Sequence, residues 1–217
     1  MTPRLISLLE ESRQLGFLGP GPVEQHLDHA AAYLAAVPDP PARALDLGAG
    51  GGLPGLVLAV TAWPSTRWTL VDAQLRRTDF LRHAVDELDL ADRVSVVTER
   101  AEEVGRHLGR RGQYQLVVAR SFGPPAVTAE CAAPLLATGG LLVASEPPTA
   151  GQECDPDGQG SARWPTDGLA RLGLGPAEIL VSGTPSFPVH LVRIALVGEV
   201  DHRYPRRVGV PAKRPLF

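Results

Sequence analysis

From residue 42 onward, short apolar runs alternate with longer amphipathic stretches. The apolar runs have the length of buried strands and lie at residues 44–47, 68–71, 94–97, 115–119 and 141–144. The stretches between them have helical spacing and lie at residues 54–62, 75–90, 101–109 and 126–137. This alternation predicts an α/β fold in which helices cover both faces of a parallel sheet, with ligands at the carboxyl ends of the strands.

The flanking segments complete this organisation. Residues 1–37 show helical spacing and end at a proline-rich hinge, residues 38–41. Residues 147–165 are polar and rich in glycine and proline, which predicts a mobile loop. Two later apolar runs, at residues 178–181 and 190–196, predict an antiparallel hairpin at the edge of the sheet. The expected fold is therefore a doubly wound, Rossmann-like, seven-stranded and mostly parallel sheet.

A chain of 217 residues with 44% apolar content fits one globular domain. Within residues 1–217 we expect a helical extension, a core and a basic tail, at residues 1–41, 42–198 and 199–217. No apolar run reaches the roughly 20 residues of a membrane helix, and no signal-peptide pattern opens the chain. We therefore expect a cytoplasmic monomer without a membrane partner.

Cysteine and histidine spacing gives no sign of a metal site. Cys131 and Cys154 lie far apart without a C-x-x-C pair, and the six histidines show no ligand spacing with carboxylates or cysteines. The net charge of −3 argues weakly against a nucleic-acid binder. The charge is segregated, however, because residues 203–217 contain no acid and five cations: Arg203, Arg206, Arg207, Lys213 and Arg214. Such a tail fits either a solvated terminus or a contact with phosphate.

The most informative motif is D-L-G-A-G-G-G-L-P-G at residues 46–55, where a strand runs into a glycine loop. Gly50, Gly52 and Gly55 satisfy G-x-G-x-x-G, the dinucleotide fingerprint. In that fingerprint the first glycine follows the strand almost directly, whereas here Gly48 and Ala49 intervene. The alternative pattern D-x-G-x-G-x-G, which begins at Asp46, resembles the first motif of S-adenosylmethionine (SAM) methyltransferases. A purely structural glycine turn is the third interpretation.

The resemblance to SAM methyltransferases implies a cofactor site around this loop. It places Asp46 near the methionine ammonium and lets Gly48, Gly50, Gly52 and Leu53 admit the ligand. Asp72, at the end of the second strand, would accept the two ribose hydroxyls under either cofactor interpretation. Asp46 could instead hydrogen-bond only the loop N–H groups, and Asp72 could be a turn carboxylate.

Five segments in order resemble the RsmG (GidB) family, bacterial methyltransferases of ring nitrogen seven of a guanosine in small-subunit (16S) ribosomal RNA. The first segment is the glycine loop with the Pro-Gly that follows it. The other four are L-R-R-x-x-F-L at residues 75–81, R-A-E-E at 100–103, V-A-R-S at 118–121, and R-Y-P-R-R at 203–207 with the residues that follow. This resemblance implies a class I SAM methyltransferase fold, places Ala101 and Glu102 beside the adenine, and gives Arg120 a role in orienting cofactor or substrate. It also implies that the cations of residues 203–214 contact rRNA.

No general base is expected, because guanine nitrogen seven has a free lone pair and loses no proton when it is methylated. Positioning of the reactants would then supply most of the rate enhancement. An arginine such as Arg120 at the end of a strand could alternatively cap a helix or pair with a surface acid.

Two departures from the family pattern weaken the assignment of the substrate. The family's lysine-glycine pair falls here on Glu146-Pro147, and its N-terminal N-L-T segment is not visible. If the family lysine faces phosphate, Glu146 would repel RNA. A small-molecule SAM methyltransferase and a catalytically weakened SAM- or RNA-binding module therefore remain alternatives.

Overall fold

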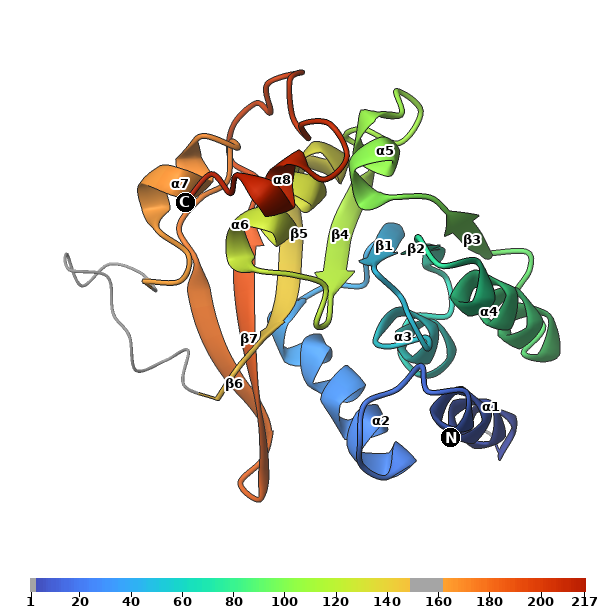
Figure 1. The fold of residues 1–217 in the computed structure, drawn as a ribbon. Coiled ribbons are helices and arrows are strands. Elements are labelled where there is room, and N and C mark those ends of the chain that lie inside the picture. The colour runs from blue at the N-terminus through green and yellow to red at the C-terminus, as the bar shows by residue number, and fades with distance from the viewer. Residues whose placement is uncertain (1–2, 149–161) are drawn as a thin grey trace.

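The structure, a computed structural model, describes residues 3–148 and 162–217 and contains one seven-stranded sheet (Figure 1). Its strands are β1 (Arg43–Leu47), β2 (Arg67–Asp72), β3 (Val94–Thr98), β4 (Tyr114–Ala119), β5 (Leu136–Glu146), β6 (Glu178–Thr184) and β7 (Phe187–Ala195). The spatial order is β3-β2-β1-β4-β5-β7-β6. The first five strands are parallel, and β7 pairs antiparallel with both β5 and β6. The predicted doubly wound sheet with an antiparallel edge hairpin is confirmed.

Helices cover both faces of this sheet. The α-helices are α1 (Pro3–Gln14), α2 (Val23–Ala31), α3 (Gly55–Thr61), α4 (Leu75–Glu87), α5 (Ala101–Arg106), α6 (Pro125–Ala132), α7 (Thr166–Ala170) and α8 (Val210–Lys213); two 3₁₀ turns are η1 (Ala32–Ala36) and η2 (Ala133–Leu135). One core cluster joins the sheet to α3, α4 and η1, and the other joins it to α5, α6 and α7. None of these helices, within the described residues, has the length and apolar character needed to cross a membrane.

The central strands are buried on both sides because their side chains are apolar in both directions. On β4, Leu116 and Val118 pack into the cluster with α3 and α4, whereas Val117 and Ala119 pack into the cluster with α5 and α6. All four side chains are at most 1% exposed. Strands buried on both faces are typical of parallel sheets and explain the unbroken apolar runs in the sequence.

The predicted helix over residues 126–137 is shorter than expected. It ends as an α-helix at Ala132 and tightens into η2, after which β5 begins at Leu136. Pro134 has no N–H to donate to a helical hydrogen bond, which accounts for the early end. The α-helical spacing of residues 133–137 therefore belongs to a turn and the start of a strand.

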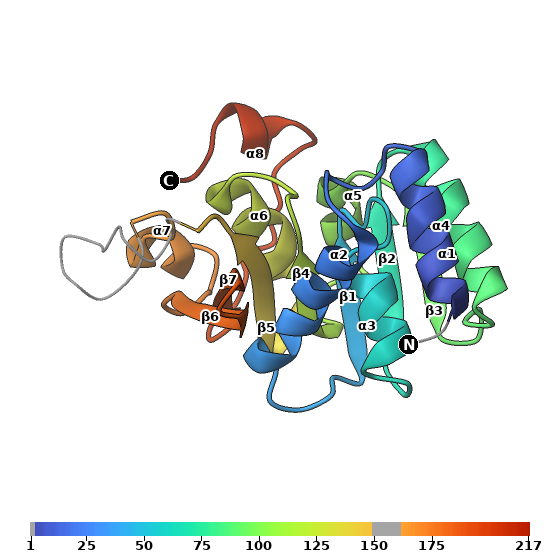
Figure 2. The same ribbon diagram turned by 90° about the horizontal axis from the view of Figure 1, so that it is seen from below.

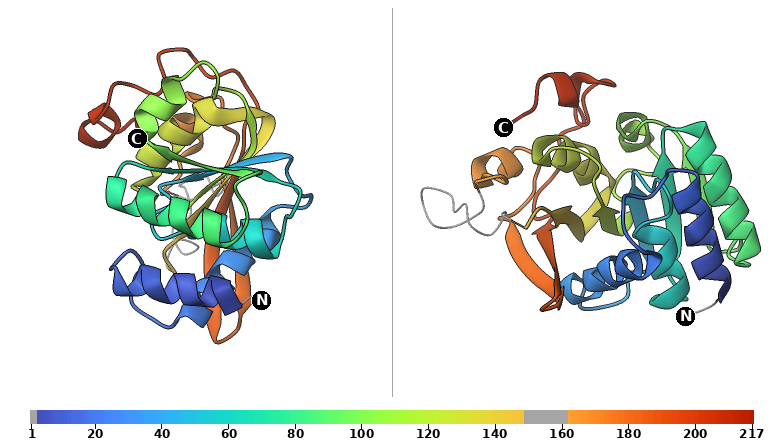
Figure 3. Two further views of the ribbon diagram at one scale, coloured as in Figure 1. Left: turned by 90° about the vertical axis from the view of Figure 1, so that its right-hand side faces the viewer. Right: turned by 60° about the horizontal axis from the view of Figure 1, so that its bottom comes forward.

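The N-terminal segment packs on the face that carries α3 and α4. In Figures 2 and 3, α1 lies beside α4, and α2 lies beside α3. Leu5, Leu9 and Val23 form a small core with Leu53 and Val57, which follow β1. The helical extension is thus in contact with the glycine loop region.

The C-terminal segment, residues 203–217, also packs on the body of the protein. Its helix α8 lies beside α6 in Figure 1, and Tyr204 is 2% exposed. The segment therefore packs on the body of the protein, while the side chains of Arg207, Lys213 and Arg214 stay exposed. Of the loop predicted over residues 147–165, residues 149–161 lie outside the described part of the chain.

Candidate functional site

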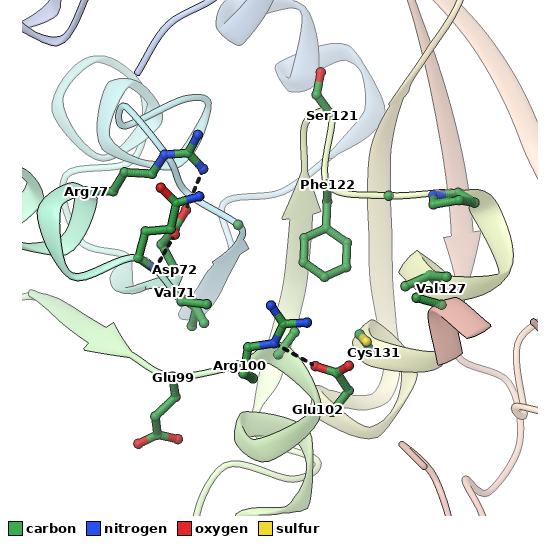
Figure 4. A pocket seen from close by; sticks show the side chains of 17 residues that line it. Val71, Asp72, Arg77, Glu99, Arg100, Glu102, Ser121, Phe122, Val127 and Cys131 are labelled. Carbon is green, nitrogen blue, oxygen red and sulfur yellow. Dashed lines mark hydrogen bonds and ion pairs between the residues drawn. The ribbon is translucent and has the colours of Figure 1, made fainter. Parts of the chain in front are cut away.

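Two adjoining pockets lie at the carboxyl ends of the central strands. The first, of about 330 Å³, is lined by residues that follow β2, β3 and β4, by α6, and by Ala212 of α8 (Figure 4). The second, of about 250 Å³, lies between the glycine loop and residues 17–19. Gly48, Arg77 and Ser121 line both pockets. A ligand that crosses Gly48 would therefore occupy both.

Asp46, at the carboxyl end of β1, is fully buried beneath the glycine loop. Its Oδ2 accepts a hydrogen bond from the Gly55 N–H at 2.7 Å. A Cβ at position 55 would lie 2.6 Å from the Asp46 Cβ, so this approach requires glycine. Burial raises the pKa of Asp46 to about 7, with a further contribution from the Asp72 charge. Because Asp46 lines neither pocket, the structure favours its role as an anchor of the loop.

Asp72, at the end of β2, holds the same loop from the side of the first pocket (Figure 4). Its Oδ2 accepts a hydrogen bond from the Gly50 N–H at 3.0 Å and lies 3.5 Å from Arg77 Nη1. Its Oδ1 accepts a hydrogen bond from the Gln74 N–H at 2.9 Å. The side chain is only 6% exposed, yet it lines the pocket. Asp72 can thus shape the loop and present a carboxylate edge to a ligand.

The glycine loop itself faces both pockets. Gly48 has a φ of +79°, and a Cβ there would lie 2.7 Å from the Phe122 ring, so only glycine fits. Gly50 and Leu53 line the second pocket, whereas Gly52 lines neither. The predicted loop residues are therefore brought together, with Gly52 contributing only to the backbone path.

Ala101 and Glu102 line the first pocket from the start of α5. The N-terminus of this helix is closed by Glu103, whose side chain accepts a hydrogen bond from the Arg100 N–H at 3.2 Å. Glu102 is 5% exposed, and its Oε2 lies 3.8 Å from Arg100 Nε. In Figure 4 the side chains of Arg100 and Glu102 project toward the pocket. The structure therefore groups Ala101 and Glu102 with Asp72.

Arg120 follows β4 and lines the second pocket. Its Nη2 lies 3.1 Å from His26 Nδ1, and His26 Nε2 lies 3.1 Å from the Gly19 carbonyl oxygen. This pattern assigns the proton of neutral His26 to Nε2, so that Nδ1 accepts from Arg120. The buried Nη1 of Arg120 has no hydrogen-bond partner within residues 3–148 and 162–217. The free N–H groups of this guanidinium nitrogen can donate hydrogen bonds to an anionic ligand group such as a carboxylate.

Two histidines of α2 lie close enough to this guanidinium for its charge to lower their pKa values. Burial lowers the pKa of His29 from 6.5 to about 4, and the charges of Arg120 and His26 add to the shift. The pKa of His26 is lowered by the same two effects, burial and Arg120, against an opposing hydrogen bond to Gly19. The positive charge of Arg120 thus favours the neutral, acceptor form of both rings.

Replacing His29 by asparagine should therefore change how stability depends on pH. Below pH 6.5 the unfolded chain binds a proton at His29 that the folded chain does not bind until about pH 4. As the pH falls from about 7.5 to about 4.5, the free energy of unfolding of the wild type should therefore decrease by roughly 2 kcal/mol relative to that of His29→Asn. Urea unfolding of both proteins across this range measures the difference. Asp46, whose raised pKa has the opposite effect on stability, is present in both proteins, so its contribution cancels. A difference that stays constant with pH would contradict the neutral state of His29.

The predicted RNA-binding cations do not have equivalent surroundings. Arg206 pairs with Glu130, which is fully buried. The backbone N–H and Nε of Arg206 donate to Glu130 Oε1 at 2.8 and 2.9 Å, and Nη2 of Arg206 donates to Glu130 Oε2 at 2.6 Å. Arg203 is exposed and lies 3.3 Å from Asp201. Three cations remain exposed without an ion pair in the described part of the chain, namely Arg207, Lys213 and Arg214. Arg206 is thus engaged internally, and the others stay candidates for phosphate.

Comparison with known proteins relates this geometry to a family. The family described as "GidB: rRNA small subunit methyltransferase G" matches residues 22–155. A "Ribosomal RNA small subunit methyltransferase G" from Chloroflexus aggregans is 38% identical over 186 residues, covering 81% of this chain and 70% of that protein. A protein of the same name from a Synechococcus strain is 36% identical over 187 residues, covering 82% and 67%. The chain belongs to this methyltransferase G family.

Solved structures show the same fold at much lower sequence identity. An O-methyltransferase from Bacillus cereus in complex with SAH aligns with a TM-score of 0.63 at 16% identity, covering 90% of this chain and 91% of that one. The O-methyltransferase TomG from Streptomyces achromogenes in complex with SAM aligns with a TM-score of 0.63 at 18% identity, covering 91% of both chains. These likenesses confirm the class I methyltransferase fold.

The glutamate at the position of the methyltransferase G family lysine has an internal partner. The side chain of Glu146 is 3% exposed, and its Oε2 accepts a hydrogen bond from Arg163 Nε at 2.8 Å. The carboxylate is therefore buried and paired, and the repulsion of RNA by Glu146 stays a prediction. A lysine at this position would face the guanidinium of Arg163.

Several residues of the site had not been predicted from the sequence, among them Ser12 and Phe122. Ser12 Oγ of α1 donates a hydrogen bond to the Gly51 carbonyl oxygen at 3.1 Å and so holds the glycine loop from the N-terminal segment. The Phe122 ring projects into the first pocket (Figure 4). An aromatic residue two positions after Arg120 was a usable signal for Phe122. No local pattern distinguishes Ser12 from an ordinary helix serine.

Proposed function

We propose that this protein is a SAM-dependent methyltransferase that methylates ring nitrogen seven of a guanosine in small-subunit ribosomal RNA. The observation that carries the proposal is the convergence of Asp72, Ala101 and Glu102 in one pocket beside the glycine loop, in a chain that belongs to the methyltransferase G family. The relatives' names supply the acceptor class, which the site alone does not specify.

The two pockets fit the two ends of SAM. In the first, the Asp72 carboxylate would accept the ribose hydroxyls, and Ala101 with Glu102 would border the adenine. In the second, the unpaired Nη1 of Arg120 would donate to the methionine carboxylate. A guanidinium also pairs with the pyrophosphate of a dinucleotide, so the preference for SAM rests on membership of the methyltransferase G family.

When bound, SAM supplies a methyl group already activated by a positive sulfonium. The side chains of this protein then need only to hold the acceptor in line with that methyl group and exclude water. Phe122 covers Gly48 with an apolar ring, and Arg120 is fixed by His26. Neither must take up a proton, because the guanine nitrogen uses its free lone pair.

The acceptor would be held from outside the pocket. Exposed cations of the C-terminal segment, Arg203, Arg207, Lys213 and Arg214, would contact rRNA phosphates. We place the reaction in the cytoplasm and expect the protein to act as a monomer, without a metal ion.

Calorimetry and one transfer assay test this function. We expect SAM to bind with a Kd in the micromolar range and NAD(H) to show no binding. Labelled SAM should then transfer its methyl group to small ribosomal subunits or to naked small-subunit rRNA, and not to a pool of cell metabolites. Binding of NAD(H) alone would overturn the cofactor assignment. Labelling of metabolites alone would replace rRNA by a small-molecule acceptor, and SAM binding without any transfer would indicate a binding module.

A further inference from the structure

The C-terminal segment, residues 203–217, is fastened to the body of the protein at both of its ends. At its start, Arg111 Nη1 donates to the Tyr204 carbonyl oxygen at 2.6 Å and Arg106 Nε donates to the Pro205 carbonyl oxygen at 2.9 Å. At its end, Arg171 Nη1 donates to the Leu216 carbonyl oxygen at 3.0 Å. The segment is therefore an element of the fold, although it lies outside the sheet.

The middle of this segment forms part of the first pocket. The Gly209 N–H donates a hydrogen bond to Glu102 Oε1 at 2.9 Å, and Gly209, with a φ of +77°, directly precedes the single turn of α8. Ala212, in that turn, lines the pocket. Glu102 therefore lines the first pocket and also, through its hydrogen bond to Gly209, positions the start of α8 beside that pocket.

The same turn also carries unpaired positive charge. Arg207 precedes α8, and Lys213 and Arg214 end it; all three are exposed, and none forms an ion pair within the described residues. Lys213 is the direct neighbour of Ala212. An anion bound to these side chains would restrain the helix turn whose inner side faces the cofactor pocket.

We propose that the C-terminal segment is a wall of the cofactor pocket and that RNA phosphates bound to its outer side make cofactor and RNA bind cooperatively. The inference rests on the proposed function, since it requires both ligands. A wall already held by phosphate contacts loses less conformational freedom when the cofactor binds. Linkage then requires each ligand to raise the affinity for the other by the same factor.

Titration of S-adenosylhomocysteine, which cannot react, measures this coupling in the full-length protein. We expect its Kd to fall about fivefold to tenfold when saturating transcribed small-subunit rRNA is present, within the range typical of coupled sites. In Arg207→Ala/Lys213→Ala this effect of RNA should fall below about twofold. The logarithmic salt slope of RNA binding should become shallower by roughly 0.7–0.9 for each phosphate that the variant no longer neutralises. Hydrogen exchange of the Gly209 amide should slow further when RNA is added to the wild-type complex.

Arg67→Ala is the matched control, because Arg67 is an exposed cation at the start of β2, at the opposite edge of the sheet from the pockets. It should retain the full effect of RNA on S-adenosylhomocysteine affinity. Ala212→Trp tests the wall directly, since Ala212 is exposed and tolerates a larger side chain without disturbing the core. We expect it to weaken S-adenosylhomocysteine binding about tenfold or more, with an unchanged melting temperature and unchanged RNA affinity in the absence of cofactor.

The outcomes separate this inference from the proposed function. Equal S-adenosylhomocysteine affinity with and without bound RNA would overturn the coupling, while methylation of rRNA by the same preparation would leave the function standing. Unchanged affinity in Ala212→Trp would overturn the wall. Failure to bind either S-adenosylhomocysteine or rRNA would overturn both the inference and the function.

Discussion

Replacing Arg206 by alanine should lower the free energy of unfolding by about 3–5 kcal/mol, the scale for leaving one charge of a buried pair without its partner. The carboxylate of Glu130 is fully buried and receives hydrogen bonds from the Arg206 backbone N–H, Nε and Nη2. The Arg206 Nη2 also donates to the Arg214 carbonyl oxygen at 2.7 Å. The substitution therefore strands a buried anion and releases the C-terminal segment from α6.

Urea unfolding at neutral pH measures this loss, and Arg207→Ala is its control. Arg207 is the next residue, is exposed, and has no ion pair in the described part of the chain. Its replacement should change stability by no more than about 0.5 kcal/mol. Equal stability of the two variants would show that the pair with Glu130 does not hold the segment. In that case Arg206 would return to the candidates for RNA contact.

Replacing Asp72 by alanine should weaken SAM binding by about 2–4 kcal/mol, or roughly 30-fold to 1,000-fold, since hydrogen bonds to a charged group are worth more than neutral ones. Two effects combine. The ribose hydroxyls would lose their acceptor, and the Gly50 and Gln74 N–H groups would lose the carboxylate that fixes the loop. The expected loss is therefore larger than that of one ligand hydrogen bond.

Calorimetry with SAM gives the affinity of this variant. Asp79→Ala is the control, because Asp79 lies on α4, is exposed, does not line the pocket, and pairs only with Arg82 at 2.9 Å among the described residues. It should bind SAM as wild type does. Should Asp72→Ala also retain the wild-type affinity, Asp72 would be a turn carboxylate and the first pocket would not hold the ribose.

The sheet and the cofactor loop were predictable because local patterns determine them. Strands such as β4 carry apolar side chains toward both helix layers, and the glycine loop after β1 forms a continuous motif in the sequence. The acidic residues at the ends of β1 and β2 could likewise be identified in the sequence, which left open whether Asp46 contacts the cofactor or holds the loop. These features depend on neighbours along the chain.

Contacts between distant residues were not predictable in this way. Glu130 and Arg206 meet across α6 and the C-terminal segment, and Glu102 meets Gly209 across the first pocket. Both acids could equally well be solvated helix residues, because the sequence pattern of a helix does not show which neighbour covers it. The same reason hid the pairing of Glu146 with Arg163 and made the basic segment look like a free tail.

The identity of the methylated nucleoside tests the central claim most directly. Small ribosomal subunits would be incubated with labelled SAM and this protein, and their RNA digested to nucleosides and separated. We expect the label to elute as guanosine methylated at nitrogen seven and Asp72→Ala to reduce it strongly. Label in any other nucleoside, or unlabelled rRNA despite tight SAM binding, would contradict it.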